Sequence, residues 1–279
     1  MASSSAKIDF LTAMSSKAAS TIRLQPDSAA RSVAPVIRAS LDQLLALVSA
    51  SELAPDPRRT GVKALFSGPP GTGKTLAARA LASHLSLPLF RVDLSSLVSK
   101  WLGETEKNLR HAFDAAESAG ALLLFDEGDS LFGKRAQVEK GTDRYANLEV
   151  SYLLQALEAH DGVVIVTTNQ RNAIDRAFLR RFDIAADFHP PTREERQQLW
   201  RQELGEAGAH VEPALLKELS QVDLSGGHIS AAARLACALA STRAETQLTP
   251  ADLYAAIASE LSKLGAAALA AQWAARANK

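Results

Sequence analysis

The stretch Gly68-Pro69-Pro70-Gly71-Thr72-Gly73-Lys74-Thr75 decides how the rest of this chain can fold. It has the form G-x-x-x-x-G-K-[ST], it follows an apolar run at residues 62–66, and it precedes an Ala/Leu-rich run at residues 76–84. The first run is typical of a buried strand and the second of a helix. A strand, a glycine-rich turn and a helix in this order indicate a phosphate-binding loop rather than an ordinary turn.

The chemistry of phosphate binding explains the fixed positions of this stretch. Glycine allows backbone angles and close approaches that a β-carbon would block, so amides of the turn and the helix N-terminus can point at phosphate oxygens. We expect Lys74 to reach the β and γ phosphates and the Thr75 hydroxyl to ligate Mg²⁺. Leu76, which begins the helix, completes the predicted binding set. The chain is therefore predicted to bind a nucleoside triphosphate with Mg²⁺.

Composition and charge limit the classes of protein to consider. The 279 residues suffice for one large domain or two modest ones. Lys plus Arg and Asp plus Glu both number 31, so no global field favours nucleic acid or a membrane surface. The single cysteine, Cys237, is predicted as core, excludes a disulfide framework and suits a reducing compartment. No apolar run approaches the roughly 18 residues of a membrane span.

The N-terminal residues lack the apolar segment of a secretory signal. Their Ser/Ala-rich composition faintly resembles an organelle transit peptide, but Asp9 and Asp27 argue against that interpretation. We expect a solvated tail and a cytoplasmic protein.

Three parts follow one another along the chain. Residues 1–58 are predicted as a tail and a helix, the helix at residues 29–53, where apolar side chains recur at helical spacing. Residues 59–191 alternate short apolar strands with helices, the pattern of a parallel sheet covered on both faces. A capping box at Thr192 and Glu195 then begins a segment with helical patterns only. Residues 192–279 are predicted as a small all-helical lid domain.

The α/β part has five predicted strands, at residues 62–66, 87–93, 121–126, 162–168 and 184–188. The third is apolar throughout, so we expect it inside the sheet. We therefore predict an α/β fold of the P-loop NTPase class, with a parallel five-stranded sheet flanked by helices.

The third strand ends in two carboxylates, Asp126 and Glu127. Ligand sites of parallel sheets lie at the carboxyl ends of the strands. We expect Asp126 to hold Mg²⁺ through its water shell and Glu127 to orient and polarise the water that attacks the γ-phosphate. The alternative, a solvated acidic strand end, is the weaker interpretation because a phosphate loop lies about fifty residues upstream.

Two further sets of polar residues follow later strands. Asn169 ends the fourth strand, where its side chain could bond both the attacking water and the γ-phosphate. Arg180 and Arg181 precede the last strand. They are either a solvated basic turn or arginine fingers that reach a neighbouring subunit, an arrangement that can supply 10³–10⁵ in rate.

An aromatic residue lies in the polar stretch Ser99-Lys100-Trp101-Leu102-Gly103-Glu104. A polar setting with a neighbouring glycine does not suit a fully buried core position for Trp101. This residue is either a packing anchor or an exposed ring that contacts a partner.

In this order, the stretches resemble the AAA+ ATPases, specifically the AAA clade with the Cdc48, katanin and Vps4-like remodelling motors. The resemblance covers about residues 62–239 and implies ATP as the nucleotide. It implies a Walker A loop at residues 68–75, a Walker B strand at residues 122–127 and sensor 1 at Asn169. Residues 143–155 are similar to bacterial Cdc48-like members.

The same resemblance implies roles for residues outside the phosphate loop. Arg180 and Arg181 match the paired arginine fingers, and Gly227 lies in the turn that opens the sensor 2 helix. Lys100, Trp101 and Leu102 match the central pore loop, which would contact the substrate.

The chain also departs from the family pattern. Ser230 stands where relatives often have a basic residue after the Gly-Gly pair, and Gly128 replaces a more usual Ala or Ile. The Pro-Gly that separates the two arginines in some members is missing, which leaves the dominant arginine open.

The resemblance implies hydrolysis of ATP to ADP and phosphate in a homo-oligomeric ring, usually a hexamer. The leading hypothesis is a chaperone-like motor that remodels, unfolds or disassembles a protein client through Trp101. The alternative is a nucleotide-dependent assembly scaffold that does not thread its partner. Neutral net charge argues against a nucleic-acid motor. A catalytically inactive module conflicts with the presence of Glu127 and both arginines.

Overall fold

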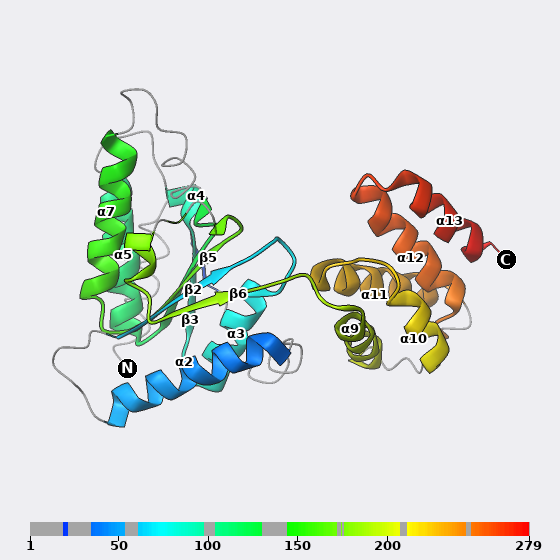
Figure 1. Ribbon diagram of the computed structural model, residues 1–279, viewed down its shortest axis with the longest axis horizontal. Coiled ribbons are helices and arrows are strands. Elements are labelled where there is room, and N and C mark those ends of the chain that lie inside the picture. The colour runs from blue at the N-terminus through cyan, green and yellow to red at the C-terminus, as the bar shows by residue number, and fades with distance from the viewer. Residues whose placement is uncertain are drawn as a thin grey trace. The chain divides into compact units, whose positions relative to one another are not determined.

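The computed structural model describes residues 19–21, 35–53, 61–97, 104–129, 144–171, 174, 176–206, 211–243 and 247–278 (Figure 1). The chain divides into two compact units. Unit 1 comprises Met1–Pro69 and Lys74–Phe188, and unit 2 comprises Pro70–Gly73 and His189–Lys279. The four residues at the tip of the phosphate loop thus group with the C-terminal helices.

Unit 1 is built on one sheet with strand order β1-β3-β4-β5-β2-β6. The strands that run parallel are β2 (Val62–Ser67), β3 (Leu89–Asp93), β4 (Leu122–Asp126), β5 (Val163–Thr168) and β6 (Ile184–Asp187). The predicted parallel five-stranded sheet is therefore confirmed, with β4 between β3 and β5 as expected of its apolar sequence.

A short edge strand lies in the segment predicted as a tail. β1 (Ala19–Thr21) pairs antiparallel with β3, and Ser20 lies opposite Arg91. Three residues are too few to show a strand periodicity, so only the pairing with β3 defines this strand.

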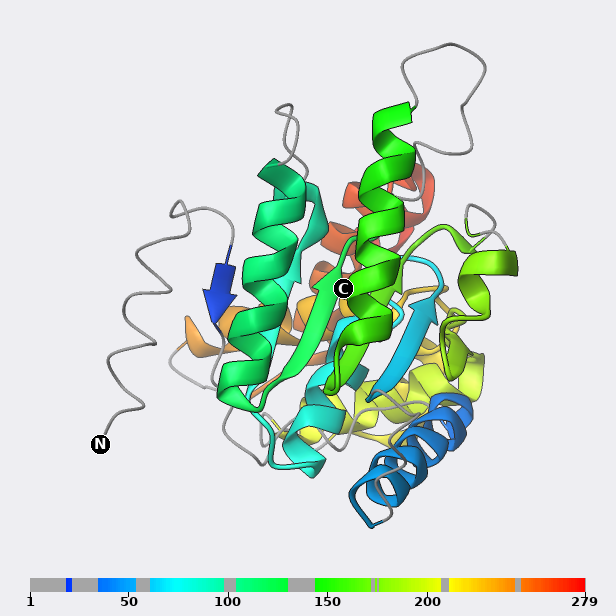
Figure 2. The ribbon, with the colours of Figure 1, turned by 90° about the vertical axis from the view of Figure 1, so that its left-hand side faces the viewer.

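Helices cover both faces of the sheet (Figure 1, Figure 2). One face packs against α2 (Pro35–Leu53) and α3 (Lys74–His84). The other packs against α5 (Glu104–Ala119) and α7 (Arg144–Ala159). Two single-turn helices, α4 (Leu94–Leu97) and α8 (Arg176–Leu179), were not predicted.

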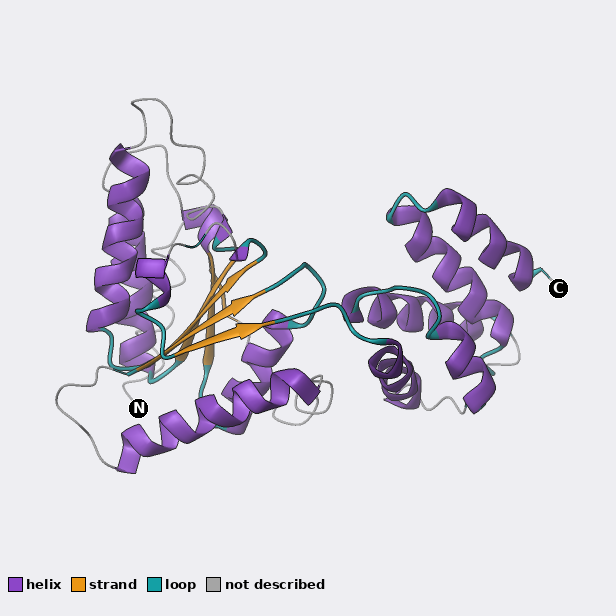
Figure 3. Ribbon diagram, in the orientation of Figure 1, coloured by secondary structure: helices purple, strands orange, loops and turns teal. Residues whose placement is uncertain are grey.

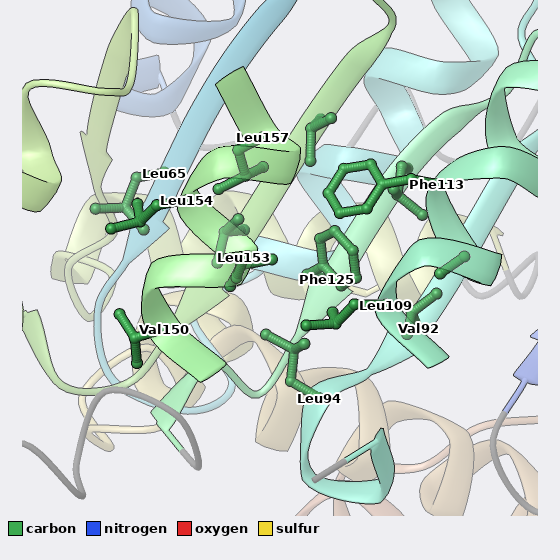
Figure 4. Close-up of a cluster of buried hydrophobic side chains, with 14 of the residues drawn as sticks. Leu65, Val92, Leu94, Leu109, Phe113, Phe125, Val150, Leu153, Leu154 and Leu157 are labelled. Carbon is green, nitrogen blue, oxygen red and sulfur yellow. The ribbon is translucent and has the colours of Figure 1, made fainter. Parts of the chain in front are cut away.

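Alternation along β4 assigns its side chains to these two faces. Leu122 and Leu124 belong to the apolar cluster beneath α2 and α3. Leu123 and Phe125 belong to the cluster beneath α5 and α7, which Figure 4 shows. Because successive residues of a strand point to opposite faces, Asp126 shares the face of Leu124 and of the phosphate-loop helix α3.

All the described secondary-structure elements after residue 192, which belong to unit 2, are helices (Figure 3). They are α9 (Arg193–Glu206), α10 (Pro213–Leu219), α11 (Gly226–Ser241), α12 (Pro250–Lys263) and α13 (Ala267–Ala277). Their core includes the fully buried Trp200 together with Leu253, Ile257 and Trp273. Within the described ranges, no helix of either unit is long and apolar enough to cross a bilayer.

Capping boxes begin two of these helices. The Thr192 amide donates to Glu195 Oε2 at 2.8 Å, and the Glu195 amide donates to Thr192 Oγ1 at 3.3 Å. The reciprocal pair of bonds recurs between Thr249 and Asp252 at the start of α12. Both satisfy amides that the first turn of a helix leaves without partners.

Asp252 is buried, and its carboxylate has a bonding partner besides Thr249 of the capping box. Its carboxylate accepts hydrogen bonds from both Nη atoms of Arg243, from the Thr249 amide and from the Thr249 hydroxyl. The bond from Arg243, followed by those from Thr249, holds the pKa of Asp252 at about 2 although burial opposes the shift. The ionised form is therefore favoured in the folded state.

Asp252→Asn should lower the free energy of unfolding of unit 2 by about 2 kcal/mol at neutral pH. A carboxyl whose pKa is lowered by folding stabilises the protein above its unfolded pKa, here near 3.8, and this contribution is lost as the pH falls through about 2. Tryptophan fluorescence during urea unfolding reports the transition, because Trp200 and Trp273 lie in this unit.

Glu194→Gln, at an exposed acid of α9, is the matched control and should change the unfolding free energy by less than about 0.5 kcal/mol. An Asp252→Asn variant that unfolds like the wild type from neutral pH down to pH 3 would contradict the assigned role of the carboxylate.

Candidate nucleotide site

The phosphate loop joins β2 to α3 and contains three glycines with positive φ. The values are 144° at Gly68, 76° at Gly71 and 97° at Gly73. A β-carbon on Gly68 would lie 2.0 Å from the Phe188 carbonyl oxygen. On Gly73 it would meet nothing within 4 Å, so the backbone angle rather than space requires glycine there. The loop therefore has an open, left-handed backbone that suits close approach of a phosphate group.

Within unit 2 the tip of the loop contacts the start of α11. The Gly227 amide donates to the Gly71 carbonyl at 3.0 Å, and a β-carbon on Gly71 would lie 2.4 Å from Ser225 Oγ. Ser225 is the N-cap of α11 and accepts a hydrogen bond from the His228 amide. The predicted sensor 2 turn and residues 70–73 thus form one packed corner of this unit.

Lys74 lies at the centre of the polar contacts in unit 1. Its Nζ donates to the carbonyls of Gly68 at 2.6 Å and Pro69 at 2.9 Å, and to Asn169 Oδ1 at 2.8 Å. Burial lowers the pKa of this lysine, while Asp129 and Asp126 act in the opposite direction. The loop carbonyls and Asn169 hold the ammonium at the place where the phosphates are expected.

Asp126 lies at the end of β4 on the α3 face. Thr75 Oγ1 donates to its Oδ2 at 3.1 Å, and Thr167 Oγ1 donates to its Oδ1. Arg91 donates to the same Oδ2 from Nε at 2.9 Å and from Nη2 at 2.8 Å. The hydroxyl and carboxylate predicted to hold Mg²⁺ are therefore neighbours. A hydroxyl and a carboxylate are the hard oxygen donors that Mg²⁺ prefers, so the residues fit this ion.

Glu127 is exposed and adopts a left-handed backbone conformation with φ 60°. Such an angle is uncommon for a residue other than glycine and concentrates at functional sites. Its amide donates to Thr167 Oγ1 at 3.3 Å, and the Gly128 amide donates to the Thr167 carbonyl at 2.9 Å. These bonds tie the backbone of the turn after β4 to the end of β5.

Asp129 is a site residue that the sequence interpretation missed. Its Oδ1 accepts hydrogen bonds from the Thr168 hydroxyl and from the amides of Asn169 at 2.8 Å and Gln170 at 3.1 Å. Its Oδ2 accepts from Asn169 Nδ2 at 2.7 Å. A carboxylate accepts only, so it sets which way the Asn169 amide faces: nitrogen toward Asp129 and oxygen toward Lys74. The third acidic residue after the strand was the available signal.

The two predicted arginine fingers lie in the turn between α8 and β6. Phe178 and Phe182 flank them, are buried in the core and have ring centroids 5.3 Å apart. These anchors leave Arg180 and Arg181 exposed. Arg181 Nε donates to Glu158 Oε1 of α7 at 2.6 Å. The structure thus distinguishes the two arginines that the sequence left equivalent.

Three further predicted site residues, Lys100, Trp101 and Leu102, lie outside the described residues. The structure brings together Lys74, Thr75, Asp126 and Asn169 at the carboxyl ends of β2, β4 and β5. This is the edge of a parallel sheet at which ligands bind.

The sheet order, the loop and these polar residues define a P-loop nucleotide-binding domain. A family model described as "ATPase family associated with various cellular activities (AAA)" matches residues 64–190. Residues 64–190 are thus an ATPase domain of the AAA family, as the resemblance implied, and are related to remodelling ATPases.

Three similar proteins illustrate the relationship. "Uncharacterized AAA family ATPase y4kL" of Sinorhizobium fredii is 39% identical over 159 residues, which cover 55% of this chain and 48% of that protein. "Cell division cycle protein 48 homolog" of Archaeoglobus fulgidus is 37% identical over 139 residues, which cover 48% and 19%. The crystal structure of the FIGL-1 AAA domain matches with a TM-score of 0.67 at 21% identity, covering 92% of this chain and 93% of that one. The chain spans less than half the length of these two curated relatives.

Asp129→Asn should lower kcat for ATP hydrolysis by about tenfold or more, equivalent to about 1.4 kcal/mol of barrier, and should change nucleotide affinity little. The substituted amide can present nitrogen to Asn169, which would no longer be held with its oxygen toward Lys74. Steady-state kinetics with a separate nucleotide-binding titration resolve the two effects. Asp114→Asn, an exposed acid of α5, is the control. Equal kcat values for Asp129→Asn and the control would contradict the positioning role.

Proposed function

We propose that this chain is an ATPase that hydrolyses ATP to ADP and phosphate and works as a ring coupled to protein remodelling. The observation that carries the proposal is the continuous set of contacts from the phosphate loop to the water side of the site. Lys74 contacts Asn169, and Asn169 contacts Asp129. Thr75 contacts Asp126. These contacts hold the side chains of Lys74, Thr75, Asp126 and Asn169 in place before a nucleotide binds, which supports the proposal.

Each side chain has a distinct part in this reaction. Lys74 neutralises phosphate charge, and Thr75 with Asp126 would hold Mg²⁺. When bound, this ion would neutralise charge that develops on the phosphate oxygens. Glu127 orients and polarises the attacking water in this proposal, which its exposed position directly after β4 supports. The Asn169 side-chain amide lies between Lys74 and Asp129 at the same edge of the sheet.

The exposed arginine turn supports the ring. Arg180 is exposed between two buried phenylalanines, and Arg181 bonds Glu158 of its own chain. We assign Arg180 as the residue that completes the site of the neighbouring subunit. Arg181 stabilises the turn against α7 in this assignment.

A mixing experiment tests this assignment. Arg180→Ala and Glu127→Gln should each reduce ATPase activity, the former by about 10³-fold, the lower limit for removal of an arginine finger. Mixed rings should regain activity, because Glu127→Gln subunits supply Arg180 to sites that retain Glu127. Arg181→Ala should reduce ATPase activity by a smaller factor than Arg180→Ala. A mixture as inactive as its components, although co-assembled in sedimentation, would contradict action between subunits.

We further propose that the client is a protein and that Trp101 contacts it in the central pore. Support comes from the neutral net charge and from the similarity to remodelling ATPases. We also propose that the chain forms a homo-hexamer in the cytoplasm. Residues 192–279 act as the lid domain in this proposal. The alternative is a nucleotide-dependent assembly scaffold, which would bind its client without threading it.

Trp101→Ala should leave basal ATPase activity within about twofold of the wild type, because the residue is not assigned to the nucleotide site, and should abolish stimulation by a client. Phosphate release with and without client measures both quantities. Trp101→Phe is the matched control and should keep the stimulation. Client stimulation of Trp101→Ala equal to the wild type would favour the scaffold over the threading motor.

A further inference from the structure

The guanidinium of Arg91 is bonded to the carboxylate of Asp126, the side chain proposed to hold Mg²⁺. Arg91 on β3 donates to Asp126 Oδ2 from both Nε and Nη2, at 2.9 and 2.8 Å. The side chain of Asp126 is 9% exposed and that of Arg91 is 32% exposed. The acid is therefore buried in a charge pair, whereas the guanidinium keeps a path to solvent.

The sheet register explains why these side chains meet. Arg91 pairs with Leu124 in the parallel β3–β4 ladder, so the two residues point to the same face. Asp126 lies two residues beyond Leu124 and shares that face as well. Leu89, two residues before Arg91, packs in the apolar cluster of α2 and α3. Arg91 thus occupies a core-facing position, and its head extends past the apolar layer to the strand end.

The hydrogen bonds leave little acceptor capacity on Asp126. Oδ2 accepts from Thr75 Oγ1 and twice from Arg91, and Oδ1 accepts from Thr167 Oγ1. A carboxylate offers about four lone-pair sites. A water molecule of a hydrated Mg²⁺ also needs an acceptor position on this carboxylate. Arg91 and the hydrated ion therefore compete for the same oxygen, and their positive charges repel each other.

We propose that Arg91 is a built-in competitor of Mg²⁺ that sets the metal affinity of the nucleotide site. In the nucleotide-free protein its guanidinium neutralises Asp126 and keeps Thr75 and the carboxylate in place. Binding of the Mg²⁺–nucleotide complex displaces the guanidinium toward solvent. The protein consequently requires a higher Mg²⁺ concentration than it would with a neutral side chain at position 91. This inference rests on the proposed function of the site.

The test measures metal binding rather than turnover. A fluorescent ADP analogue is titrated into the full chain in EDTA, and Mg²⁺ is then titrated into the complex to obtain its midpoint. Arg91→Met should lower the Mg²⁺ midpoint by about tenfold, the effect of one opposing charge near the ion. Arg91→Lys keeps the charge and should stay closer to the wild type. Electron paramagnetic resonance of bound Mn²⁺ gives the same affinity order directly.

Arg110→Met is the matched control, because it removes one exposed arginine of α5 that bonds Tyr152 rather than Asp126. Its Mg²⁺ midpoint should equal that of the wild type. Arg91→Gln is the second neutral variant and keeps a hydrogen-bond donor if Arg91→Met fails to fold. It should also lower the midpoint.

The outcomes separate this inference from the proposed function. A wild-type chain that binds ADP neither in EDTA nor with saturating Mg²⁺ would overturn the nucleotide site and the inference together. Normal ADP binding with an unchanged or higher Mg²⁺ midpoint in the neutral variants would overturn the inference alone. In that case Arg91 only supports Asp126 structurally.

Discussion

The hydrogen bond between Lys74 and Asn169 is the interaction around which the proposed nucleotide site is arranged. It joins the first turn of α3 to the end of β5 across the edge of the sheet. An ammonium buried there lacks water, so its charge requires the loop carbonyls and the Asn169 oxygen as partners. Asp129 in turn holds the Asn169 amide by its nitrogen. The orientation of the Asn169 side chain thus follows from its two charged partners, Lys74 and Asp129.

The parallel sheet makes this arrangement possible. β4 and β5 are adjacent and in register, so Asp126 and Thr167 end at the same edge and share a hydrogen bond. β2 lies on the other side of β5 and delivers the phosphate loop to that edge. The buried leucine and phenylalanine side chains of the core fix the strands, and the polar strand ends inherit that rigidity (Figure 4). Packing and chemistry are therefore coupled through strand register.

Charge pairs distinguish residues that look alike in the sequence. Arg180 and Arg181 are adjacent and both exposed, and Arg181 donates a hydrogen bond to Glu158 of α7. Arg91 is one of many arginines, yet the register of β3 brings it to Asp126. Each pairing joins residues far apart in sequence and belongs to the packing of helices and strands. No local pattern contains it.

The sequence alone determined the phosphate loop, the five parallel strands and the capping box at Thr192 and Glu195, because these features depend on residue spacing and backbone preferences within short windows. The roles of Asp129 and Arg91 and the edge strand at residues 19–21 were decided by tertiary structure. The role proposed for Asp129 depends on its hydrogen bond with Asn169, and the role proposed for Arg91 depends on its bond with Asp126. The physical reason is strand register: it places side chains from separate segments within hydrogen-bond distance, and local sequence does not specify which segments become neighbours.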